Sequence, residues 1–335
     1  MFLRMSAHAA MLAACLFFSG PARADEPQRP LDDRGVLSLQ IENDLTQNTD
    51  RHYTNGLRLT YLTPEGGIPG SVNAAADVVP LFPSEGRKRA SFTLGQSMFT
   101  PSNTQLRDPP VTDRPYAGWL YGGVGIVSDT GKQLDTLELD LGIVGPQSYA
   151  EQAQKFWHHV IGARQPQGWS HQLKNEPGAV LTYERTWRAV AQAYPLGFAA
   201  DLSPHAGGAL GNVLTQGAGG LMLRVGRNLP QDYGPPRIRP SVPGSDFFIP
   251  TSAFGWYLFA GAEERAVLHN IFLDGNTFAH SPSVDRNTWV GDFQFGIAVT
   301  FGEVRVALTE VNRTREFSGQ QHPDAFAALT VGTRF

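Results

Sequence analysis

The stretch TLELDLGIV, residues 136–144, decides the fold. Leucine or isoleucine occupies every second position from 137 to 143, and Thr, Glu, Asp and Gly fill the positions between them. The stretch DFQFGIAVTF, residues 292–301, repeats the alternation with Phe, Ile and Val on one side. A period of two residues is typical of a strand with one apolar face and one polar face.

About twelve segments of roughly ten residues share this alternation, which is the pattern of a transmembrane antiparallel β-barrel. They lie near residues 36–44, 53–63, 90–99, 117–127, 133–144, 178–190, 197–210, 219–228, 255–265, 289–301, 303–313 and 326–335. The last segment ends on Phe335, which resembles the terminal assembly signal of bacterial outer-membrane proteins. A secreted soluble β-sandwich would also alternate, but the apolar sides here are rich in Leu, Phe and Val and carry almost no charge. The sequence therefore predicts an all-β barrel in the bacterial outer membrane.

Aromatic residues near the strand ends suggest girdles at the two membrane interfaces. These residues are Tyr53, Tyr61, Trp119, Tyr121, Trp256 and Tyr257.

The first 24 residues read as a signal peptide. Arg4 supplies the positive charge, an apolar run follows it, and Ala22-Arg23-Ala24 predicts cleavage after residue 24, although lipidation at Cys15 is an alternative. Residues 25–335 then form one domain, which contains no cysteine and so excludes disulfide and thiolate chemistry. Its 25 basic and 31 acidic residues argue against nucleic acid as a partner. No apolar stretch of membrane-spanning length follows the signal.

The expected topology gathers the unusual polar segments at one end of the barrel. With both termini in the periplasm, the connections 45–52, 100–116 and 145–177 all lie outside the cell, and SDTGK, residues 128–132, is a short periplasmic turn. The connection 64–89 is long for that side. Segments far apart in sequence would thus meet at the outer rim.

The alternation also predicts which side chains face inward. Leucine and isoleucine at 37, 39 and 41 face lipid, so Glu42 and Asp44 face the lumen. On the next strand Leu57 and Leu59 face lipid, so Thr54 faces the lumen too, whereas Asn43 falls on the outward phase.

The connection 145–177 is long enough to contain a helix over residues 149–162. Gln154 and His158 are four residues apart and share one face beside an apolar stripe. Gly162 is a plausible helix stop. Such a helix across the rim would present the pair to the barrel wall.

These residues suggest an ester hydrolase without a serine nucleophile. Asp44, with backbone carbonyls of its loop and with Asp50 as an additional candidate, could bind Ca²⁺. A bound cation polarises an ester carbonyl, and the imidazole of His158 could activate water. Each motif also has an ordinary interpretation: the Asp44 loop is common turn chemistry, and a lone histidine on a loop helix is usually polar surface. His159, next to His158, adds an ambiguity.

The chain resembles the outer-membrane lipid A deacylase family. The matching pieces are ENDLTQNTDRHYTNG, FTPS, DRPYAG, GPQSYAEQAQKFWHHVIG, GWSHQLKNEP and the terminal RF. They match closely over residues 36–178 and more loosely over the remaining strands. The resemblance implies a twelve-stranded barrel that removes the ester-linked acyl chain at the 3′ position of lipid A in a Ca²⁺-dependent reaction. It places the site between the wall and a loop helix, near the outer leaflet.

Carried over by position, the resemblance implies that His158 is the catalytic base and that Gln154 or Asn43 positions the imidazole or the substrate. It implies that Asp44 is a calcium ligand and that Thr54 belongs to the site. The remaining implied positions are Arg114, which could contact a lipid A phosphate, and Glu176, a candidate for a further acidic residue. Asp113 stands where some family members have a lysine.

Two other functions remain open from the sequence. A passive porin or structural barrel would have an open lumen and no need of the Gln154–His158 pair. A serine-dependent membrane lipase could use Ser170 and His171, although adjacent residues rarely reach the geometry of a nucleophile and its base.

Overall fold

The computed structural model describes residues 30–44, 51–68, 70–77, 81–83, 85–240 and 244–335. The predicted signal peptide lies outside these residues. The chain divides into two compact units, residues 1–31 and 32–335, and the second unit contains all the strands and helices of the described residues.

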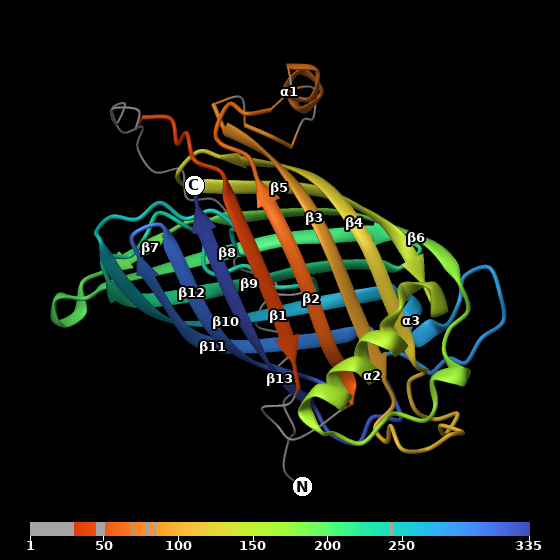
Figure 1. Ribbon diagram of the computed structural model, residues 1–335. Helices are drawn as coiled ribbons and strands as arrows, with labels where there is room; N and C mark the ends of the chain where they lie inside the picture. Colours follow the sequence, from red (N-terminus) through yellow and green to blue (C-terminus); the bar gives the residue numbers. More distant parts are fainter. Residues whose placement is uncertain (1–29, 45–50, 69, 78–80, 84, 241–243) are drawn as a thin grey trace, which may run out of the picture. The chain divides into compact units, whose positions relative to one another are not determined.

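Within the described residues, thirteen strands form one antiparallel sheet (Figure 1). They are β1 (Val36–Asn43), β2 (His52–Leu62), β3 (Arg87–Thr100), β4 (Ala117–Asp129), β5 (Gln133–Val144), β6 (Glu176–Trp187), β7 (Ala191–Ala193), β8 (Ala199–Gly211), β9 (Leu214–Arg227), β10 (Phe254–Asn270), β11 (Trp289–Phe301), β12 (Val304–Arg313) and β13 (Asp324–Arg334). Pairing of β1 with β13 and of β6 with β8 closes the ring, and the short β7 pairs only with β8. The prediction of a barrel of about twelve strands is confirmed, because the ring without β7 contains twelve.

The two faces of each strand follow the alternation of the sequence. On β1 the leucine and isoleucine side chains at 37, 39 and 41 are exposed, whereas Ser38, Gln40 and Glu42 are buried in the lumen. On β5 Leu139 and Leu141 are exposed and Glu138 is buried. The exposed apolar residues of successive strands form the lipid-facing surface that the alternation predicts.

The prediction of aromatic girdles is wrong for four of the six residues. Only Tyr61, stacked between Phe92 and Phe335, and Trp256 keep partly exposed rings. The other four fall on the inward phase of their strands and pack in the lumen, where the alternation of faces outweighs the preference of aromatic rings for the interface: Tyr53, Trp119, Tyr121 and Tyr257.

Helices occur only in the connections among the described residues. They are α1 (Gly70–Asp77), α2 (Ala150–Ile161) and α3 (Ile271–Asp274), with short 3₁₀ turns at η3 (Pro146–Ser148), η4 (Trp169–His171) and η5 (Pro195–Gly197). The helix expected over 149–162 is therefore confirmed as α2, and it ends at Gly162, whose φ of 71° is left-handed. None of the described helices is long and apolar enough to cross a membrane.

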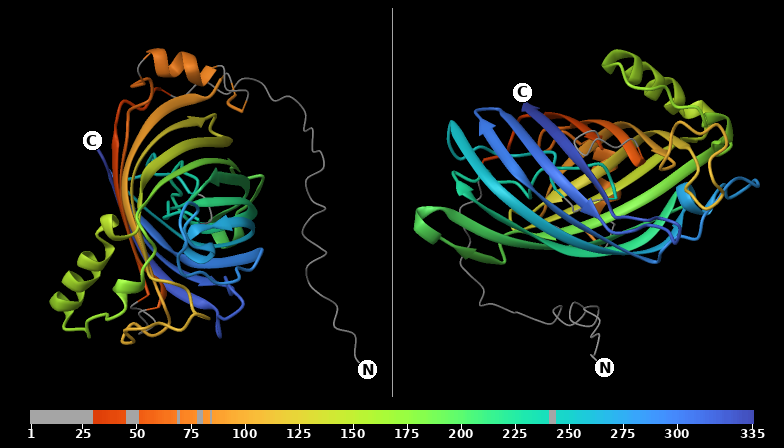
Figure 2. Two further views of the ribbon diagram at one scale, coloured as in Figure 1. Left: turned by 90° about the vertical axis from the view of Figure 1, so that its right-hand side faces the viewer. Right: turned by 90° about the horizontal axis from the view of Figure 1, so that it is seen from below.

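The connection between β9 and β10 folds back into the lumen. Its described parts, residues 228–240 and 244–253, run within the ring of strands (Figure 2) and bury Tyr233, Ile238 and Phe248. We call these residues the plug.

Charged groups fasten the plug to strands on different sides of the barrel. Asp232 accepts a hydrogen bond from Arg305 on β12 at 2.8 Å. Arg237 donates from Nε to Glu42 on β1 at 3.1 Å, and both side chains are fully buried. Arg239 donates to Glu184 on β6 at 2.7 Å. The Asp232–Arg305 and Arg237–Glu42 pairs are shielded from water, so removing one partner would leave a buried charge uncompensated.

Candidate functional site at the outer rim

Helix α2 begins against the outside of the barrel wall, at the end of the barrel where β1 ends and β2 begins, and its later turns lean away from the strands (Figures 1 and 2). Gly118 on β4 allows the close approach, because a Cβ atom there would collide with Ser148 and Ala150. Gln96 on β3 donates from Nε2 to the carbonyl of Ser148 at 2.6 Å. The first turn of α2 is thus fixed on the outward face of β3 and β4.

Beneath the helix, an apolar cluster joins α2 to the wall and to the segment that follows the helix. Ala150 packs with Met98 of β3, Tyr116 and Trp169. The rings of Tyr116 and Trp169 lie 4.8 Å apart. Trp169 is therefore the residue that links η4 to the underside of α2.

The predicted pair, Gln154 and His158, occupies the buried face of α2, with exposed fractions of 2% and 8%. The indole Nε1 of Trp169 donates to Oε1 of Gln154 at 2.7 Å, which fixes the orientation of the amide. The ring nitrogen Nδ1 of His158 lies 2.5 Å from the carbonyl oxygen of Arg164. A carbonyl can only accept a hydrogen bond, so Nδ1 must carry a proton and a neutral ring has its lone pair on Nε2.

The strand ends beside α2 hold the remaining polar residues. Asn43 donates from Nδ2 to the carbonyl of Thr54 at 3.0 Å. The hydroxyl of Thr54 lies 2.7 Å from that of Thr100, which is on the outward face two residues beyond Met98. These contacts place Asn43 and Thr54 on the same side of the wall as Met98, which packs against the start of α2.

The inward orientation predicted for Thr54 is wrong. A register shift between Tyr53 and Asn55 makes Thr54 the extra residue of a β-bulge, and the backbone of His52 is left-handed with a φ of 63°. The bulge sends Tyr53 into the lumen and turns Thr54 toward Thr100, so simple alternation fails at this strand end.

Asp44 directly follows β1 and is buried. Its Oδ2 accepts a hydrogen bond from the backbone N–H of Arg51 at 2.8 Å. Asp50 lies outside the described residues. Among the residues that the structure describes, no group of three or more His, Cys, Asp and Glu side chains could hold a metal ion. The ligand set expected from the sequence is of a different kind, one carboxylate with backbone carbonyls.

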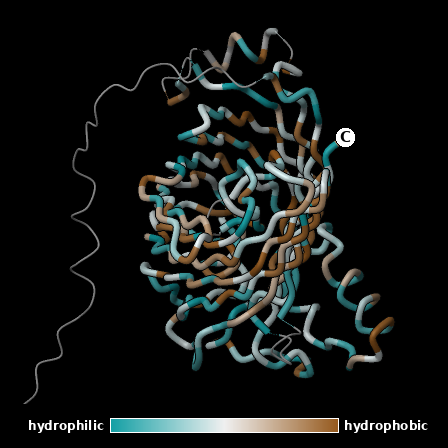
Figure 3. The backbone as a smooth tube through the Cα atoms, turned by 90° about the vertical axis from the view of Figure 1, so that its left-hand side faces the viewer, coloured by the Kyte–Doolittle hydropathy of each residue, from teal (hydrophilic) through white to brown (hydrophobic). Residues whose placement is uncertain are grey.

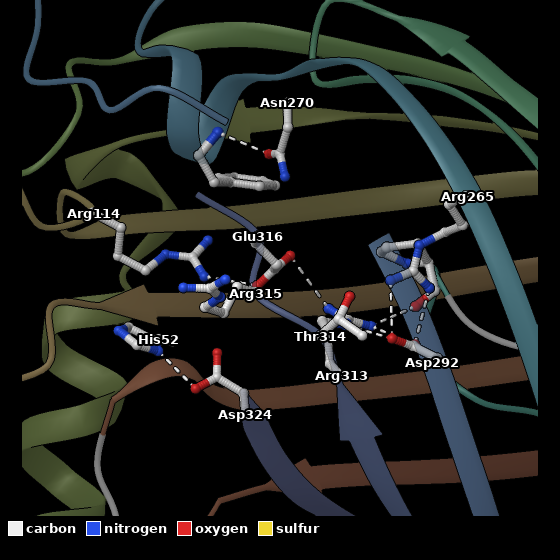
Figure 4. Close-up of polar contacts among 12 residues, drawn as sticks. His52, Arg114, Arg265, Asn270, Asp292, Arg313, Thr314, Arg315, Glu316 and Asp324 are labelled. Atoms are coloured by element: carbon white, nitrogen blue, oxygen red, sulfur yellow. Dashed lines mark hydrogen bonds and ion pairs between the residues drawn. The ribbon is translucent and has the colours of Figure 1, made fainter. Parts of the chain in front are cut away.

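Arg114 is placed differently from the expectation of a phosphate contact. Its guanidinium is fully buried, lies over the ring of Phe99 at 4.7 Å, and donates to Glu316 at 3.2 Å (Figure 4). Burial lowers the pKa of Arg114. Because the group faces the lumen side of the rim, we assign it to the support of the loops.

The neighbouring Asp113 also supports a loop. Its carboxylate accepts hydrogen bonds from the backbone N–H of Ser102 at 2.8 Å and from its own successor, the N–H of Arg114, at 2.8 Å. Burial raises the pKa of Asp113, but hydrogen bonds from His52 and Ser102 outweigh burial and the pKa is lowered. The carboxylate of Asp113 thus has a structural task in this loop.

Glu176 and His159 lie outside the arrangement around His158. The carboxylate of Glu176 accepts hydrogen bonds from the backbone of Thr277 and Phe278 and from the amides of Asn212 and Asn276. It therefore anchors the connection that follows α3. His159 is exposed on the surface of α2.

A family model described as "Outer membrane protein LpxR" matches residues 11–335. The chain belongs to the LpxR family. A solved structure named LpxR from Salmonella typhimurium has a TM-score of 0.72, with 20% sequence identity, and the match covers 90% of this chain and all of that one. The β domain of the Bordetella autotransporter BrkA matches with a TM-score of 0.41, 10% identity and coverage of 91% and 98%. A comparison with curated proteins found no match. Membership in the LpxR family and the barrel fold place the chain in the bacterial outer membrane.

This LpxR family member also brings Ser170 and His171 together, against the expectation from their adjacency. Oγ of Ser170 lies 3.2 Å from Nδ1 of His171, whose Nε2 is 3.2 Å from Asp108. All three residues are exposed, and the side chain of Asp108 is 88% accessible. A carboxylate in that much water holds an imidazole only weakly.

Sequence reasoning missed three partners in the candidate site. Trp169 belongs to the motif GWSHQLKNEP. Its hydrogen bond to Gln154 joins two segments separated by an irregular turn, so no periodic pattern in the sequence predicts it. Thr100 meets Thr54 only because of the bulge. The carbonyl of Arg164 contacts His158 because the chain folds back after Gly162, and a backbone acceptor leaves no residue signal.

Proposed function

We propose that this LpxR family member is a lipid A deacylase that hydrolyses the ester-linked acyloxyacyl chain at the 3′ position of lipid A. The observation that carries the proposal is the imidazole of His158, which lies on the buried face of α2 and is oriented by the Arg164 carbonyl. This arrangement lies at the rim expected to face the outer leaflet, where lipid A resides.

In the proposed reaction, Nε2 of His158 takes a proton from the water that attacks the ester carbonyl. The proton can return from the imidazolium to the leaving hydroxyl oxygen of the sugar. Because Nδ1–H remains bonded to the Arg164 carbonyl, the ring keeps one orientation through both transfers. The side-chain amide of Gln154 lies on the same helix face as the imidazole, and the hydrogen bond from Trp169 fixes its orientation.

Calcium is compatible with the donor chemistry near Asp44. A buried carboxylate with the amide and hydroxyl oxygens of Asn43 and Thr54 nearby offers the hard oxygen donors that Ca²⁺ prefers. When bound, the ion would polarise the ester carbonyl and favour its developing negative charge. Asn43 would hold the strand end in place through its bond to the Thr54 carbonyl.

The plug weighs against the passive porin. A porin of this fold would need an open path through the lumen, whereas the plug crosses the lumen and pairs with β1, β6 and β12. A structural barrel without activity would not require a buried histidine in a fixed tautomer on a loop helix.

Mass spectrometry of lipid A from cells that express the chain tests the proposal. We expect loss of the mass of one acyloxyacyl unit with the wild-type chain and no loss with His158→Ala. The matched control is His159→Ala, which removes an exposed neighbour and should retain activity. Unchanged lipid A with a folded, heat-modifiable wild-type barrel in the presence of calcium would reject the proposal.

A further inference from the structure

The surface of α2 that faces away from the wall is apolar and uncovered. Four side chains have exposed fractions above one half: Tyr149, the residue before the first turn, at 60%, and within the helix Phe156 at 61%, Trp157 at 53% and Val160 at 55%. Phe156 and Val160 are one turn apart, so they lie side by side along the helix. We call these four residues the outer apolar face of α2.

A polar face runs along the other exposed side of the same helix. Glu151 and Lys155 form an ion pair at 2.6 Å, and Gln152 and His159 are exposed beside it. With about 100° between successive residues, the buried pair, the outer apolar face and the polar face occupy three separate sectors of the helix. The division matches a helix that lies in a membrane interface, with one side toward acyl chains and another toward water.

The start of α2 lies beside the lipid-facing surface of the barrel. Gln96, which holds Ser148 at the start of the helix, is two residues from Leu94 on the same outward face of β3. At a rise of about 3.3 Å per residue, Gln96 and the exposed Leu94 of the lipid-facing surface are about 7 Å apart along β3. Figure 3 shows hydrophobic colour at the tip of α2, on the side away from the wall.

We infer that the outer apolar face of α2 inserts into the acyl-chain region of the outer leaflet that surrounds the barrel. The occupant is bilayer lipid in general, because the face points away from Gln154 and His158 and so lies outside the catalytic arrangement. Aromatic side chains such as Tyr149 and Trp157 suit this level of a membrane. The inference does not depend on the proposed reaction, since contact with lipid requires no turnover.

Single cysteines carrying an environment-sensitive fluorophore test the inference, because the only native cysteine is Cys15 in the predicted signal peptide. We choose Val160→Cys for the outer apolar face and His159→Cys as the matched control on the polar face. Both residues are exposed, so the label replaces surface side chains. The folded barrel is reconstituted in phosphatidylcholine vesicles with or without brominated phosphatidylcholine, which quenches only fluorophores in contact with its acyl chains.

We expect brominated lipid to quench the label at residue 160 at least about twofold more than the label at residue 159, since an interfacial helix buries one side. Equal quenching at both positions, or stronger quenching at 159, would overturn the inference. A label at 160 that is unquenched overturns it as well. If that label becomes quenched only on dilution of protein in lipid, the face is covered by a second copy of the chain instead.

Discussion

Replacing Trp169 by phenylalanine probes how the buried side of α2 is held. The substitution keeps an aromatic ring in the cluster with Met98, Tyr116 and Ala150, but it removes the indole N–H that donates to Gln154 at 2.7 Å. A buried acceptor that loses its donor costs about 1–3 kcal/mol. If the lost hydrogen bond destabilises the active position of α2 by that amount, the rate of deacylation falls about 5- to 150-fold.

The assay is the rate of fatty-acid release from lipid A by purified protein, with heat modifiability as the check that the barrel is folded. A second variant, Trp169→Phe with Gln154→Leu, removes donor and acceptor together and should restore the resistance of the α2 segment to proteolysis without restoring activity. A Trp169→Phe protein with the wild-type rate and the wild-type protease pattern would refute the reasoning. The hydrogen bond from Trp169 to Gln154 would then affect neither the position of α2 nor the rate of deacylation.

Three further predictions concern the rival nucleophile, the cation and the plug. Ser170→Ala should retain deacylation, and loss of activity in a folded Ser170→Ala barrel would favour the serine mechanism. A calcium chelator should abolish the wild-type activity, and added calcium should restore it. Asp44→Asn should stay inactive at the same calcium concentration. Wild-type activity that is unchanged by the chelator would contradict the role of Asp44. Arg237→Met leaves the carboxylate of Glu42 buried without its charged partner and should lower the free energy of unfolding in urea by about 3–5 kcal/mol. Glu42→Gln combined with Arg237→Met should recover part of that loss, and a change below about 1 kcal/mol in the single variant would show that the pair is not shielded from water.

The strands and the helix were predictable because each follows a local period. Alternation from 136 to 144 and from 292 to 301 marks strands wherever one side meets lipid, and the four-residue spacing of Gln154 and His158 places both on one face. The plug was not predictable, because residues 228–240 and 244–253 have no period and are held by charged partners on distant strands.

The site was predictable in outline, and the errors arose where the backbone departs from regularity. The bulge beside Tyr53 reversed the predicted direction of Thr54. Arg114 carries a charge that suggested a surface contact, yet Phe99 and Glu316 hold it in the interior. No local sequence pattern predicts this bulge or these tertiary partners.

The proposed chemistry depends on proton transfer at one imidazole. The most direct measurement is release of the acyloxyacyl chain from lipid A by purified wild-type, His158→Ala and His159→Ala proteins, compared at equal amounts of folded barrel and at one calcium concentration. We predict that His158→Ala slows release roughly 100- to 10,000-fold while His159→Ala stays near the wild-type rate. Release at the wild-type rate by the folded His158→Ala protein would contradict the account.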